Sequence, residues 1–123
     1  PTERPKFVSY IDDRAPLNER AKAYLDINCA QCHNPKGPAK SSGLFLDYHY
    51  YGTTAYGIMK SPVAAGRGSG NLLYDIVPGK PTESILHYRM NSHDPGVMMP
   101  ELGRTIVHQE GVELVRAWIK SLN

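Results

Sequence analysis

The clearest hydrophobic pattern lies near the end of the chain. Between residues 107 and 122, apolar positions recur at spacings of three and four: Val107, Gly111, Leu114, Val115, Trp118, Ile119 and Leu122. An α-helix places positions with this spacing on one face, so the pattern predicts a helix with one buried side. Gly111 lies on that side, where glycine costs about 1 kcal/mol relative to alanine. A close crossing with another helix would offset this cost.

A second helix is predicted over residues 17–28. Its stripe consists of Leu17, Ala21, Tyr24, Leu25 and Asn28. Glu19 falls in the first turn, where the helix dipole favours a carboxylate. Because Ala21 and Tyr24 lie on the stripe, we expect them to meet Gly111 where the two helices cross. This helix ends directly before Cys29.

The remaining chain is mostly loop, since it contains most of the 11 Gly and 10 Pro residues. Alternation over residues 44–51 predicts a short extended stretch. Pro81 suits the first turn of a helix that includes Ile85, Leu86 and Met90 and ends before Pro95. Residues 1–16 contain three prolines, which predict an extended arm or linker, and residues 17–123 then form one domain. The fold class expected is all-α.

The chemistry is concentrated in Cys29-Ala30-Gln31-Cys32-His33. Two thiols separated by two residues and followed by an imidazole form the attachment signature of a c-type haem. Each thiol can add to one vinyl group of the porphyrin, and His33 can bind the iron. A large aromatic cofactor also suits a 123-residue chain with only two Phe and one Trp, whose own core is thin. We therefore expect one haem c, covalently bound through Cys29 and Cys32.

Two other uses of the cysteines fit less well. A redox dithiol of the thioredoxin type opens a helix after a strand, whereas Cys29 follows a helix and no strand precedes it. A structural zinc ion needs four ligands, but the sequence has no second CxxC. Adjacent Cys32 and His33 are also poorly placed to bind one ion together.

The second axial ligand of the iron is expected in the segment Gly96-Val97-Met98-Met99-Pro100. Proline stiffens this loop, so a thioether there can be held in place with little entropy left to lose. We choose Met99 as the ligand and expect Met98 to pack beside the haem, with His87 as the next candidate. An iron without a firm sixth ligand would instead indicate a haem-based sensor or small-ligand binder.

The glycine-rich segment 66–70 does not read as a phosphate loop, because no Lys-Ser or Lys-Thr pair follows it. Backbone passing close to the haem edge is the better interpretation. Arg67 is then a candidate partner for a haem propionate, since its planar fork matches a carboxylate. Lys60, Arg104 and the tyrosines near position 50 remain open alternatives.

With the helix–CxxCH opening, the Met-Pro loop and the amphipathic final helix in this order, the chain resembles class I c-type cytochromes. Residues 16–25, 74–79 and 99–103 look like parts of the cytochrome modules found at the ends of larger secreted bacterial proteins. The resemblance implies the cytochrome c fold, with crossed N- and C-terminal helices and long loops around the haem. It also implies one-electron transfer rather than an enzymatic activity of its own, serving a redox partner protein or a fused oxidoreductase domain.

Charge and hydropathy indicate which other classes of partner are not expected. A formal charge of +2 without a basic cluster does not suggest nucleic acid. No apolar run approaches the roughly 20 residues that span a bilayer, so we expect no membrane span, and we expect a monomer. Haem c is attached outside the bacterial cytoplasm, which implies a periplasmic or extracellular protein. For the same reason we expect a leader that was removed or lies upstream, and the start at Pro1 without Met is what a processed or excised fragment would have.

Overall fold

A computed structural model describes residues 9–10, 12–63, 66–94, 96–99 and 109–123. Three α-helices lie in this part of the chain: α1 (Leu17–Asn28), α2 (Ile85–Met90) and α3 (Gln109–Ser121). Five short 3-10 helices lie between α1 and α2: η1 (Lys40–Ser42), η2 (Tyr48–Tyr50), η3 (Thr54–Tyr56), η4 (Gly66–Ser69) and η5 (Pro81–Glu83). These described segments contain isolated bridges, Ile58–Ile76 and Tyr74–Ser84, but no strand. The all-α class is therefore confirmed.

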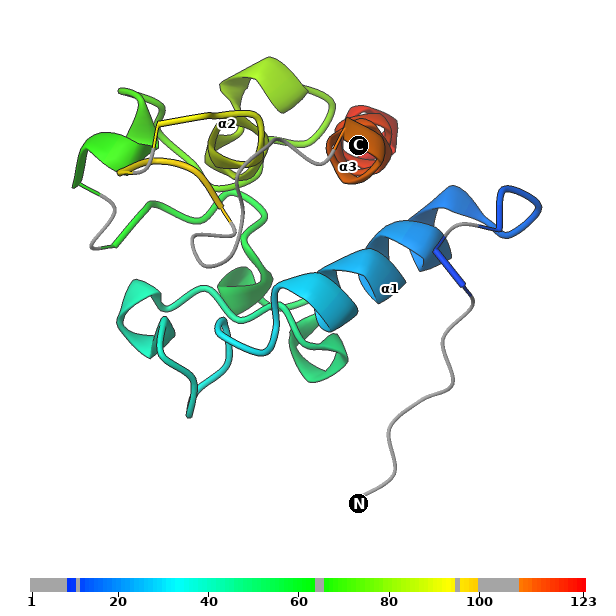
Figure 1. The fold of residues 1–123 in the computed structure, drawn as a ribbon, viewed down its shortest axis with the longest axis horizontal. Helices are drawn as coiled ribbons and strands as arrows, with labels where there is room; N and C mark the ends of the chain where they lie inside the picture. Colours follow the sequence, from blue (N-terminus) through cyan, green and yellow to red (C-terminus); the bar gives the residue numbers. More distant parts are fainter. Residues whose placement is uncertain (1–8, 11, 64–65, 95, 100–108) are drawn as a thin grey trace.

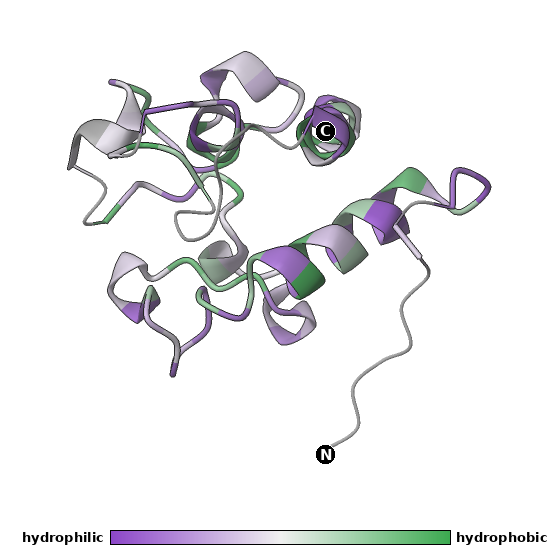
Figure 2. Cartoon of the chain, in the orientation of Figure 1, coloured by the Kyte–Doolittle hydropathy of each residue, from purple (hydrophilic) through white to green (hydrophobic). Residues whose placement is uncertain are grey.

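The α1–α3 crossing organises the core. Figure 1 shows α3 nearly end-on while α1 runs across the page, so the two helices cross steeply. Gly111 meets Tyr24 at the crossing, as its place on the stripe predicted. Leu25 and Trp118 are fully buried beside it, and the indole Nε1 donates to Asn18 Oδ1 over 2.8 Å. Figure 2 shows hydrophobic and hydrophilic residues on different sides of α3.

Both long helices follow their hydrophobic stripes. The helix predicted over 17–28 has these bounds in the structure. The final helix is confirmed over Gln109–Ser121, while Val107 lies outside the described residues. At the other end of the chain, Tyr10 packs edge-on against Tyr24 with ring centroids 5.2 Å apart. Arg20 Nε also donates to the Tyr10 carbonyl over 3.0 Å, so the described part of the first 16 residues contacts α1.

The prediction of an extended stretch over residues 44–51 is wrong for the second half of these residues. Tyr48–Tyr50 form η2 instead. The Tyr48 N–H donates to Asp26 Oδ2 over 2.9 Å, and the Lys22 ammonium lies 4.2 Å from the centroid of the Tyr51 ring. The tyrosines therefore gather toward α1, and the described residues include no partner strand that would stabilise an alternating extended backbone.

The helix predicted from Pro81 is interrupted at Ser84. Its first turn is η5, and α2 begins only at Ile85. Ser84 is fully buried, and its hydroxyl donates to the Lys80 carbonyl over 3.0 Å and accepts from the Val77 N–H over 2.8 Å. Such side-chain bonds to local backbone compete with helix geometry, which explains the extended backbone at this residue. None of the described helices is long and apolar enough to cross a bilayer.

Candidate functional site

The CxxCH segment forms a tight turn at the C-terminal end of α1. The Cys29 N–H donates to the Leu25 carbonyl over 2.9 Å. The Cys29 carbonyl then accepts from the N–H groups of Cys32, over 3.2 Å, and His33, over 2.9 Å. The following loop packs closely on this turn, because a β-carbon at Gly37 would collide with the Cys32 carbonyl. Glycine at this position therefore allows the backbone to approach the motif.

Both thiols are free, so the described structure contains no disulfide between Cys29 and Cys32. Cys29 is partly buried and packs against the hydrophobic core. Burial, together with the neighbouring Cys32, raises the pKa of its thiol to about 12. Redox-active cysteines instead have lowered pKa values, often at a helix N-terminus. Because Cys29 caps the C-terminal end of α1, the geometry gives the dithiol interpretation no support.

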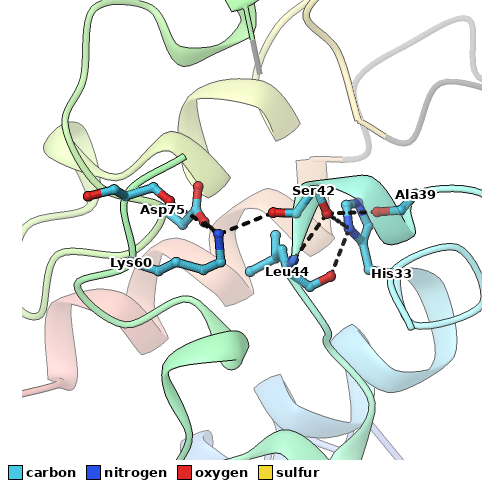
Figure 3. Close-up of polar contacts among 7 residues, drawn as sticks. His33, Ala39, Ser42, Leu44, Lys60 and Asp75 are labelled. Carbon is cyan, nitrogen blue, oxygen red and sulfur yellow. Dashed lines mark hydrogen bonds and ion pairs between the residues drawn. The ribbon is translucent and has the colours of Figure 1, made fainter. Parts of the chain in front are cut away.

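The hydrogen bonds of His33 determine which ring nitrogen carries its proton. Nδ1 lies 3.2 Å from the Leu44 carbonyl and 3.3 Å from Ser42 Oγ. The Ser42 hydroxyl has one hydrogen, which it donates to the Ala39 carbonyl over 2.8 Å. Both neighbours of Nδ1 can therefore only accept, so Nδ1 must donate (Figure 3). In the neutral ring the lone pair then lies on Nε2, in the tautomer typical of a metal-binding histidine.

His33 and Met99 line the same cavity, whose volume is about 60 Å³. Its apolar wall includes Leu44, Leu46, Ile85 and Leu86. Met99 is held there by its backbone, since its N–H donates to the Arg89 carbonyl over 3.0 Å. Of the two adjacent methionines, Met99 is the one that lines this wall. The structure thus brings together the imidazole of the CxxCH motif and the thioether of the predicted ligand loop.

One part of the cavity wall is charged. Asp75 is only 7% exposed, and burial raises the pKa of its carboxyl, while Lys60 and Arg89 lower it. Lys60 Nζ lies 3.8 Å from Asp75 Oδ2. Arg89 also lines the cavity, and its Nε donates to the Val97 carbonyl over 2.8 Å. A buried acid and an arginine therefore line the cavity with His33 and Met99, and a lysine lies behind the acid.

The residues around this cavity fit a haem in their chemistry. A nitrogen donor and a sulfur donor line one cavity, and the two thiols that precede His33 in the sequence have the spacing for porphyrin attachment. The buried hydroxyl of Tyr56 has no hydrogen-bond partner, and burial and the nearby Cys29 raise its pKa. An unsatisfied buried hydroxyl is unfavourable, and an acceptor on a group bound next to Cys29 would satisfy it.

The cavity volume does not by itself accommodate a porphyrin. Ligand sites usually enclose about 300 Å³ or more, so the walls would have to separate for a porphyrin ring to bind. A larger open groove of about 850 Å³ lies beside the same motif and is lined by Ile27, Ala30, Gln31 and Tyr50, among others. The lining of that groove includes neither His33 nor Met99. The two predicted axial ligands and the larger space therefore lie in different places.

The other candidate ligands lie elsewhere. His87 is on α2, where burial and Arg116 lower its pKa and Glu113 raises it, so it is close to charged residues of α3. His49 and His93 are exposed, and His108 lies outside the described residues. Within the parts of the chain that the structure describes, no three His, Cys, Asp or Glu side chains gather as a metal-binding group. The zinc interpretation therefore finds no ligand set.

Arg67, the residue predicted near the haem edge, lies in η4, but its side chain is outside the described residues. Arg104 also lies outside them. Arg89 and Ser42, which sequence reasoning did not select, are on the cavity wall instead. Arg89 has one signal in the sequence: it follows Leu86 by three residues, on the apolar side of a short helix. Comparisons with protein-family models, curated proteins and solved structures found no match.

Proposed function

We propose that this chain is a one-electron transfer protein with a single haem c. Cys29 and Cys32 would attach the porphyrin, and His33 and Met99 would bind the iron. The observation that carries the proposal is that His33, with its proton on Nδ1, lines the same cavity as Met99. These two residues come from distant parts of the sequence, and their pairing is what a six-coordinate haem requires.

Each part of the site has a separate physical role. The haem iron, when bound, cycles between its ferrous and ferric states. The thioether of Met99 stabilises the ferrous state more than a second imidazole would. The apolar wall excludes water, which also disfavours the more highly charged ferric state. Arg89 offers a charged group for a carboxylate at the cavity wall, while Arg67 stays a prediction for the same role.

The crossing of α1 and α3 supports a cytochrome c fold for residues 17–123. In the proposed assignment, the chain serves a redox partner protein or a fused oxidoreductase domain, in the periplasm or outside the cell. Electron-transfer encounters of this kind bury small interfaces and dissociate quickly.

Absorption spectroscopy of the chain co-expressed with a haem c attachment system tests the proposal. We expect a covalently bound haem, a low-spin spectrum and the weak far-red band of a thioether-ligated ferric iron. A high-spin ferric spectrum that shifts on addition of cyanide, with carbon monoxide binding the reduced form, would favour the sensor. The absence of any Soret band would contradict both.

Replacement of the proximal ligand provides the second test. His33→Ala should prevent stable haem incorporation, because the iron loses the ligand next to its tethers. His49→Ala is the matched control, since His49 is exposed. A His33→Ala holoprotein with an unchanged spectrum would contradict the ligand assignment.

A further inference from the structure

Lys60 and Asp75 form a buried ion pair next to the segment that holds His33. Their side chains are 12% and 10% exposed. The Lys60 ammonium donates to the carbonyls of Ser42 and Ser61, each over 3.1 Å, and faces Asp75 Oδ2 at 3.8 Å. Two hydrogen bonds and the ion pair therefore hold the ammonium in position. A buried ion pair is worth retaining mainly where it specifies one arrangement of the groups around it.

The residue that Lys60 holds, Ser42, is one of the two residues that contact Nδ1 of His33. Ser42 accepts from Lys60 through its backbone carbonyl and contacts His33 Nδ1 through its hydroxyl. The same hydroxyl accepts from the Leu44 N–H over 3.1 Å, which brings the Leu44 carbonyl to Nδ1. Gly43, between Ser42 and Leu44 in the chain, has a φ of +67°, a left-handed conformation that favours glycine. Figure 3 shows this line of contacts from Asp75 through Lys60 and Ser42 to His33.

We propose that Lys60 and Asp75 are positioning residues for the iron-binding imidazole. The inference rests on the proposed function for its redox consequence. Lys60 holds Ser42 and Leu44 in place, and these two residues orient the His33 ring and keep its proton on Nδ1. The pair also sets the local charge beside the ligand, with the lysine favouring the ferrous iron and the carboxylate favouring the ferric iron.

The charge effect and the positioning effect can be separated with a double variant. Lys60→Met removes the positive charge but keeps an unbranched stem, and should lower the reduction potential. Asp75→Asn removes the negative charge and should raise it. In Lys60→Met/Asp75→Asn the positive and the negative charge are both removed, so their opposing effects on the potential offset each other. The loss of the donor to the Ser42 and Ser61 carbonyls remains. A looser Nδ1–H bond makes the imidazole a weaker electron donor, so this variant should have a potential above that of the wild type.

Ligand orientation gives a readout that a charge change alone does not move. The g-values of the low-spin ferric iron in electron paramagnetic resonance should differ from wild type in the double variant and in Ser42→Ala. Lys120→Met is the control, because Lys120 is exposed on α3, and it should match the wild type. If the double variant returns both the potential and the g-values to the wild-type values, the positioning role is wrong.

A measurement without haem separates this inference from the proposed function. In the full chain produced without haem attachment, ¹⁵N chemical shifts of the His33 ring should show the Nδ1–H tautomer. Ser42→Ala and the Lys60→Met/Asp75→Asn variant should shift the ring toward a mixture of tautomers, and Lys120→Met should not. A wild-type ring protonated on Nε2, or a ring unaffected by both variants, would overturn the inference even if haem binding is established.

Discussion

Gly111 in α3 lies so close to Tyr24 in α1 that a β-carbon at this glycine would overlap the phenol ring. The ring cannot easily move, because Tyr24 is 2% exposed and packs against Tyr10. Gly111→Ala should therefore lower the free energy of unfolding by about 1–3 kcal/mol through overpacking. This loss should appear although alanine improves helix propensity by about 1 kcal/mol. Urea denaturation followed by circular dichroism measures it.

The hydroxyl of Tyr24 is the atom that a new β-carbon would meet first. Adding Tyr24→Phe to Gly111→Ala should therefore cost less than the sum of the two single substitutions. This coupling identifies the contact, since independent sites add. If the Gly111→Ala variant has wild-type stability, the two helices can move apart at this contact without a loss of unfolding free energy.

The two long helices could be predicted because their buried residues recur with the helical period. Residues 44–51 could not, since their alternating pattern has meaning only opposite a partner strand. In the structure Tyr48 pairs its backbone with Asp26, and Tyr51 faces Lys22. The interruption at Ser84 could not be predicted either. This buried serine interrupts the helical segment through hydrogen bonds to the backbone of Lys80 and Val77, and the spacing of apolar residues does not reveal such bonds.

Met98 and Met99 lie in the loop that we propose to supply the second axial ligand, and they should respond differently to substitution. Met99→Ala should lower the reduction potential and let cyanide or imidazole bind the iron, because Met99 lines the cavity with His33. Loss of a thioether removes the ligand that favours the ferrous state. Spectroelectrochemical titration and ligand-binding titrations measure both effects.

Met98→Ala is the matched control for this assignment, because it removes an identical side chain one position earlier. Its holoprotein should keep the wild-type potential and bind no added ligand. If Met98→Ala alone lowers the potential and opens the iron, the ligand choice is reversed.

The Cys29 thiol of the haem-free folded chain should be unusually unreactive. Burial raises its pKa from an ordinary value of 9.0 to about 12. Three pKa units correspond to about 10³-fold less thiolate below pH 9, and the thiolate is the reactive form. Higher intrinsic nucleophilicity offsets part of this loss.

Alkylation of Cys32→Ala by iodoacetamide, which leaves Cys29 as the one thiol, measures this protection. The rate in buffer should be at least tenfold below the rate in concentrated urea, and it should still rise with pH above about 9. Equal rates in buffer and in urea would mean that the haem-free chain does not hold Cys29 in its core.

The site could be predicted as far as its motif extends. Cys29, Cys32 and His33 are adjacent in sequence, and Met99 is marked by the proline after it. The supporting residues have no such mark, because Ser42, Lys60 and Asp75 come from separate loops. Their role depends on where those loops pass, and loop paths leave no hydrophobic period in the sequence.

Asp75 should make the stability of the chain depend on pH. Its folded-state pKa is raised above 3.8, mainly by burial, so the folded chain binds the proton more tightly than the unfolded chain. Well below 3.8 both states are protonated and ionisation has no effect on stability. As the pH rises through 3.8 toward the folded pKa, the unfolded chain ionises first and stability falls. Above the folded pKa the loss is complete.

Asp75→Asn removes this titration. The difference in unfolding free energy between Asp75→Asn and the wild type should therefore shift in favour of the variant as the pH rises from about 3 to about 7. Lys60→Met should move the same transition to higher pH, because Lys60 lowers the pKa of Asp75. Urea titrations at a series of pH values measure both shifts. A difference independent of pH would mean that Asp75 has the same pKa in the folded and unfolded chains, and that water reaches it beside His33.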